Sequence, residues 1–165
     1  MSDNVDEELA RRLQEVADSV AGMSEDEAVE ALELRLKQVQ ANGLALHRLS
    51  LARARGTLAL ALADHAEPDV IASLEQMVTS IETAAPIASP ELAPLTRVSD
   101  PDAPEYDPEL AGNLADLLQV HHQNAVAIYG LIARTTVAGD DPELLAALER
   151  LVAYDLEAIT ELDPR

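Results

Sequence analysis

Three polar side chains that can do chemistry, His47, His121 and Asp155, fall on helical seams that are otherwise apolar. Imidazole nitrogens and a carboxylate can bind a divalent transition metal, and a His–Asp pair can also transfer protons. The pair can instead be a hydrogen-bonded part of the core, because pairing removes much of the cost of burying either group alone. Counting along the expected helices places His121 within reach of Asp155. A metal site, an acid–base pair, a structural pair and exposure at an oligomer face all stay open.

Three arginines, Arg48, Arg53 and Arg55, lie in a stretch from Leu34 to Ala63 that contains no acid. They predict either ion pairs with acidic faces of neighbouring helices or a docking surface for an acidic partner or small anion. His47 followed by Arg48 is similar to the start of a histidine phosphotransfer helix. However, Ser50 stands where that motif has lysine.

The charge balance is strongly acidic, with a net charge of −20 and one lysine beside ten arginines. This composition resembles that of proteins from salt-loving archaea, whose surfaces stay hydrated at high salt; an acidic mesophilic protein is the alternative. The negative electrostatic field of this chain repels polyanions, which argues against nucleic acid or an anionic membrane as a partner. The N-terminus has no apolar signal core, and the most apolar window, 44–63, carries three arginines, so we expect a cytoplasmic protein.

The elements that must position these residues are helices, since the core has to be built from Leu, Ala, Val and Ile, and aromatics make up only 2% of the chain. We expect one all-α domain, 1–165. Its parts are an N-terminal helix in 1–23, a first hairpin in 24–85, an extended crossover in 86–107 and a second hairpin in 108–163. A capping box at Ser24–Glu27 starts the long helix of the first hairpin, which either continues to about residue 64 or breaks at Asn42–Gly43. Six of the nine prolines fall in 86–108, which predicts the crossover.

An internal repeat relates the two hairpins by a shift of 74 residues. The matched positions include His47 with His121, Gly56 with Gly130 and Pro68 with Pro142. Two matching hairpins can close a four-helix core. The glycines fall mid-helix, where they predict close helix–helix approach.

The second half resembles the ferritin and rubrerythrin superfamily through residues 123–133, 141–145 and 155–158, together with the long crossover between two hairpins. The resemblance implies a ferritin-like four-helix bundle. Iron members use a Glu on the first helix of each hairpin and Glu-x-x-His on the second. Here Ala158, not His, stands three residues after Asp155, and Ile81 is the counterpart of Asp155 in the first hairpin. Asn124 or Gln123 stands near the first-helix Glu position, and Ser50 stands near the equivalent position of the first hairpin. We therefore expect no standard di-iron site and no cofactor; the alternative is a divalent transition metal at His47, His121 and Asp155.

These observations favour a non-enzymatic ferritin-like bundle that is a structural or protein-interaction module in a halophile cytoplasm. Its central helices carry little charge, which predicts a homodimer. A divergent metal- or small-ligand-binding protein is the first alternative, and a histidine phosphotransfer or signalling bundle is the second.

Overall fold

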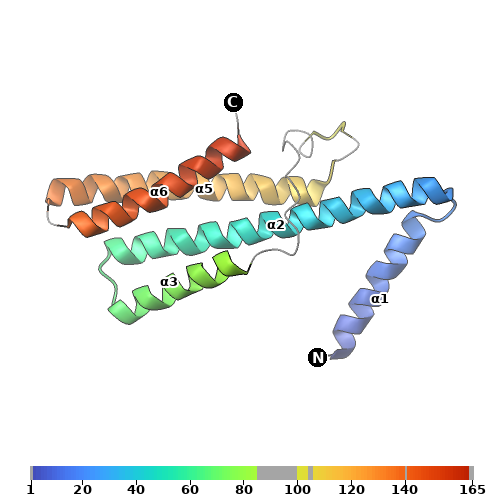
Figure 1. The fold of residues 1–165 in the computed structure, drawn as a ribbon, viewed down its shortest axis with the longest axis horizontal. Helices are drawn as coiled ribbons and strands as arrows, with labels where there is room; N and C mark the ends of the chain where they lie inside the picture. Colours follow the sequence, from blue (N-terminus) through green and yellow to red (C-terminus); the bar gives the residue numbers. More distant parts are fainter. Residues whose placement is uncertain (1, 85–99, 104–105, 140, 164–165) are drawn as a thin grey trace. The chain divides into compact units, whose positions relative to one another are not determined.

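The computed structural model describes residues 2–84, 100–103, 106–139 and 141–163, with the side chains of residues 2–6, 8 and 9 excepted. The described helices are α1 (Ser2–Ser19), α2 (Glu25–Ala63), α3 (Pro68–Thr83), α5 (Pro108–Ala138) and α6 (Pro142–Leu162) (Figure 1). No strand occurs in these residues, so the expected all-α class is confirmed. Most of the expected crossover, 86–107, lies outside the described residues. No described helix has both the length and the hydropathy needed to cross a bilayer.

The helix starts follow the sequence signals. The backbone N–H of Ser24 donates to Glu27 Oε2 at 2.9 Å, and the N–H of Glu27 donates to Ser24 Oγ at 3.4 Å, which confirms the capping box. The Ser24 N–H and the Ser24 hydroxyl both donate to the Glu27 carboxylate, and these two bonds lower the pKa of Glu27. The Asp107 carboxylate accepts the N–H groups of Glu109 and Leu110 at the start of α5, and Asp141 accepts that of Leu144 at the start of α6.

The long helix α2 does not break at Asn42–Gly43. Gly43 keeps ordinary helical geometry, since the positive-φ glycines of the described chain are Gly22 and Gly139. The Asn42 side chain instead accepts a 2.5 Å hydrogen bond from Asn113 Nδ2 on α5. Asn42, which belongs to a possible helix end in the sequence, therefore connects α2 to α5 by a hydrogen bond.

The chain forms two compact units, Met1–Val39 and Gln40–Arg165. The first unit holds α1 and the start of α2. On α1 the apolar side chains Leu13 and Val16 are exposed.

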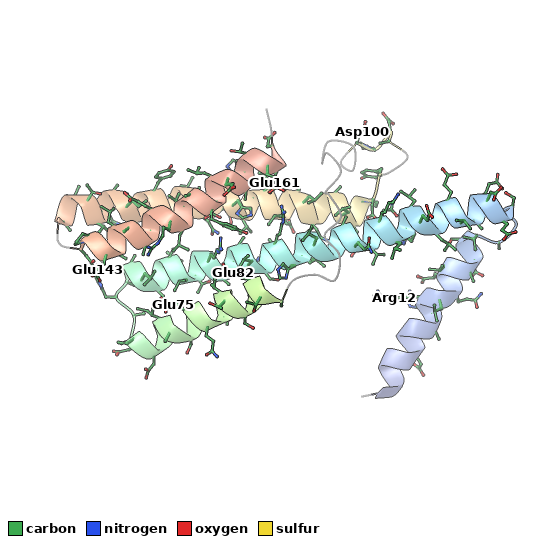
Figure 2. All side chains as sticks on the ribbon, viewed as in Figure 1. Arg12, Glu75, Glu82, Asp100, Glu143 and Glu161 are labelled. Carbon is green, nitrogen blue, oxygen red and sulfur yellow. The ribbon has the colours of Figure 1, made fainter. Side chains whose placement is uncertain are left out.

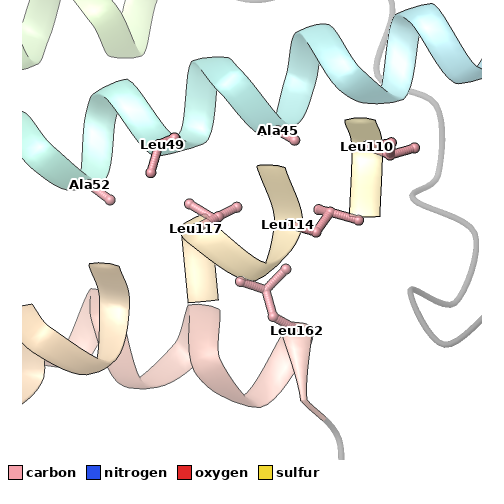
Figure 3. Close-up of a cluster of buried hydrophobic side chains, with 7 residues drawn as sticks. All are labelled: Ala45, Leu49, Ala52, Leu110, Leu114, Leu117 and Leu162. Atoms are coloured by element: carbon pink, nitrogen blue, oxygen red, sulfur yellow. The ribbon is translucent and has the colours of Figure 1, made fainter. Parts of the chain in front are cut away.

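The second unit contains the buried core, in three apolar clusters. One cluster joins α2, α5 and α6 around Leu117 (Figure 3), and another joins the same helices around Ile128 and Leu148. The last packs Leu51, Ala54 and Leu58 of α2 against Val78 of α3. On α2, three fully buried alanines repeat every seven residues along the side that meets α5: Ala45, Ala52 and Ala59. Small side chains on this line let the two helix backbones approach closely.

The turns that end α2 and α5 share an unusual backbone conformation. His65 has φ 50° and Gly139 has φ 73°, both in the left-handed region. The two residues are related by the same 74-residue shift as the repeat. Glycine adopts this conformation without strain, whereas a histidine pays a steric penalty between its Cβ and the following carbonyl.

We predict that His65→Gly raises the free energy of unfolding by about 1 kcal/mol, because it removes this left-handed strain. Gly139→Ala should lower it by a similar amount. Urea unfolding followed by circular dichroism measures both, and His65→Ala separates backbone strain from loss of the imidazole. Destabilisation by His65→Gly would show that the His65 side chain outweighs the strain.

Candidate functional site

A buried hydrogen bond joins the two residues that the sequence placed within reach of each other. Nδ1 of His121 on α5 and Oδ1 of Asp155 on α6 share a hydrogen bond of 2.6 Å, and each side chain is only 1% exposed. The bond forms because α5 and α6 pack side by side as a hairpin. Water cannot compete for a bond at this depth, which makes it stronger than the same bond at the surface. The other carboxylate oxygen, Oδ2, is buried without a hydrogen-bond partner among the described residues.

Asn124 connects this pair to α2. Its Nδ2 donates to the backbone carbonyl of Ala52 at 2.9 Å and lies 3.4 Å from Asp155 Oδ1. The α2 residue facing it is Gly56, where a Cβ atom would lie 2.4 Å from Asn124 Oδ1. The expected close approach is therefore confirmed at Gly56. Within the described part of the chain it is wrong at Gly130, where none of the described residues lies within 4 Å of the equivalent Cβ position.

Tyr154 covers the pair from the α6 side. Its ring meets the His121 ring edge-on, with 5.7 Å between centroids, and the Arg55 guanidinium lies 3.5 Å above the tyrosine ring centroid. Arg55 also forms an ion pair with Glu82 on α3. Burial raises the pKa of the Tyr154 hydroxyl, because the phenolate is disfavoured away from water; the positive charges of Arg55 and Arg48 offset part of this effect.

The three sequence-predicted arginines have different environments. Arg48 pairs with Glu161 at 2.9 Å and Arg55 with Glu82, so the ion-pairing interpretation holds for these two. Arg53 is exposed and makes no ion pair within the described residues. It lines a groove of about 490 Å³ between α2 and α5.

His47 does not join the buried pair. It is half-buried and lines a separate pocket of about 410 Å³ with Ser80 and Ile81 of α3. Ile81 is the repeat counterpart of Asp155, so the first hairpin places an apolar residue where the second has a carboxylate. In the described part of the chain, no three His, Asp or Glu side chains lie close enough together to hold a metal ion.

Sequence reasoning missed Tyr154, and it named Asn124 only as standing near the position of a family glutamate, without its contact with Asp155. Gly56 was a usable signal for Asn124, because a glycine in the middle of a helix indicates that a neighbour comes close. Tyr154 had a weaker signal, as one of only three tyrosines in the chain. With these residues added, the site is a closed polar network whose hydrogen bonds connect three helices.

Comparison with protein-family models, curated proteins and solved structures gives no match. The ferritin-like connectivity therefore remains a prediction from the sequence.

We predict that Gly56→Ala lowers the free energy of unfolding by ~1–3 kcal/mol, since the new methyl group collides with the Asn124 side chain. The matched change Gly130→Ala should raise it by up to ~1 kcal/mol, because alanine favours helix and the site is open. Urea unfolding of both variants tests this contrast. Equal effects of the two substitutions would contradict it.

We predict that the free energy of unfolding falls as the pH rises above 10.0, the ordinary pKa of tyrosine. In that range the unfolded chain releases the Tyr154 proton while the folded chain keeps it, so ionisation favours unfolding. Tyr154→Phe should remove this part of the slope, and Tyr129→Phe, at an exposed position, should leave it unchanged. Urea unfolding from about pH 8 to about pH 11 measures the slopes. An unchanged slope in Tyr154→Phe would contradict the prediction.

Proposed function

We propose that the chain is a non-enzymatic helical module with a structural or protein-interaction role in the cytoplasm of a halophile. The observation that carries this proposal is the closed His121–Asp155 pair. The two residues best suited to chemistry are each 1% exposed and bonded to each other. A side chain in that position fixes how α5 packs on α6, and it is not presented to a substrate.

We further propose that the fold is a ferritin-like four-helix bundle made of two duplicated hairpins. The left-handed residues His65 and Gly139 support the duplication, as do the prolines that open α3 and α6 at equivalent positions. Each hairpin thus has a left-handed residue after its first helix and a proline in the first turn of its second. The net charge of −20 supports the halophilic habitat.

One observation favours the alternative of a metal- or small-ligand-binding protein. Asp155 Oδ2 is buried and has no partner among the described residues, and buried polar groups are normally satisfied by protein, water or an ion. His121 and Asp155 would provide the protein groups of such a site.

The test is the effect of His121→Ala on stability and on metal content. We predict a loss of ~3–5 kcal/mol in the free energy of unfolding, because the substitution leaves a buried carboxylate without its main partner. The neighbouring His122 is exposed, so His122→Ala is the matched control and should change little. Replacing both His121 and Asp155 by Leu should recover much of the loss, since no buried charge then remains.

Elemental analysis of protein purified without chelator completes the test. We expect no stoichiometric iron, manganese or zinc in the wild type. Stoichiometric metal that disappears in His121→Ala but persists in His122→Ala would overturn the proposal and establish the ligand-binding alternative.

A further inference from the structure

The acidic residues of the second unit are distributed unevenly among its helices. α3 carries Asp69, Glu75 and Glu82, and α6 carries exposed acids from Glu143 to Glu161 (Figure 2). By contrast, α2 has no acid from Leu34 to Ala63, and α5 has none from Leu117 to Gly139. In a chain with 31 acids, these stretches of the two long helices thus present an outer surface without acidic side chains of their own.

This surface contains a groove and exposed apolar side chains. The groove, of about 490 Å³, runs between α2 and α5, and no acid lines it. Large apolar side chains on the same two helices remain in water: Val126 is 75% exposed, Val137 is 89% exposed and Leu60 is 50% exposed. We define the acid-free face as the outward residues of these two stretches, some of which line the groove: Arg53, Thr57, Leu60, Gln123, Val126, Ala127, Gly130, Arg134 and Val137.

Gly130 gives the acid-free face a further property. A mid-helix glycine is less stable than alanine by up to ~1 kcal/mol, yet none of the described residues lies within 4 Å of its Cβ position. The glycine therefore leaves room for a backbone that comes from outside the chain. It lies between Val126 and Val137 on an outward part of α5.

We propose that the acid-free face is the contact surface for a second copy of this chain, in a two-fold symmetric dimer. Two chains of charge −20 repel each other when acid-bearing surfaces meet, whereas paired acid-free faces bury no carboxylate. The acidic helices α3 and α6 then stay in water. This inference rests on the proposed function, since it names the partner of the interaction module.

The charges on the face favour a second copy over a strongly acidic partner. Such a partner requires a cluster of cations, but Arg48 and Arg55 are already paired with Glu161 and Glu82. Among the described residues that line the groove, Arg53 is the only charged one. The exposed Arg134 of α5 lines a different pocket, which Asp64 and Asp141 also line. A partly apolar surface with two separated cations matches a copy of itself better than it matches a polyanion.

The test is sedimentation velocity of the full chain, from micromolar to near-millimolar protein, in a series of potassium chloride concentrations. We expect the wild type to be a dimer. Val126→Glu and Leu60→Glu, which place a carboxylate in the interface, should each weaken association by about tenfold or more. Val70→Glu, at a 48% exposed valine of α3, introduces the same charge outside the face and should leave the dimer intact.

Circular dichroism confirms that each variant remains folded. A wild type that is monomeric throughout the series would overturn the inference, as would Val126→Glu and Leu60→Glu dimers as strong as the wild type. If the wild type is monomeric and free of metal, the dimer proposal is refuted and the proposed function is not. Metal lost on substitution of His121 would overturn the proposed function whatever the state of association.

Discussion

Asp155 is a carboxylate removed from water, and the packing of three helices follows from the need to satisfy it. The hydrogen bond from His121 satisfies one oxygen and fixes the position of α6 on α5. Asn124 supports the same oxygen and also reaches the carbonyl of Ala52, which extends the network to α2. That reach is available only because Gly56 has no side chain. Each residue thus constrains the next, and none can change in size or polarity without consequence for its neighbours.

Much of the fold could be predicted from the sequence because its signals are local. Asp107–Pro108 and Asp141–Pro142 combine an N-cap carboxylate with a proline in the first helical turn, and both start helices as expected. The contact of His121 with Asp155 was also predictable, since helical rise fixes their levels in a hairpin. The continuity of α2 through Asn42–Gly43 was not, because the side chain of Asn113, 71 residues away, decides it.

The rest of the site depends on distances that no local pattern encodes. Equivalent sequence positions do not guarantee equivalent surroundings: Gly56 faces Asn124, whereas Gly130 faces open space. His47 likewise meets Ile81 where His121 meets Asp155, so one half of the apparent repeat has a polar centre and the other does not. The side chains of the polar network therefore come from α5 and α6, whereas α3 packs on α2 through Leu, Ile and Val side chains and the Arg55–Glu82 ion pair.

The position of Tyr154 between Arg55 and His121 makes it an optical reporter. The chain has no tryptophan, so its ultraviolet absorption and fluorescence above the peptide bands come from three tyrosines. Tyr129 is half exposed, while Tyr154 is held by a guanidinium on one side and an imidazole edge on the other. Such a fixed asymmetric environment gives an aromatic ring a circular dichroism signal that disappears when specific packing is lost. The near-ultraviolet circular dichroism of this protein thus follows the packing of Tyr154 against Arg55 and His121, and it requires no added label.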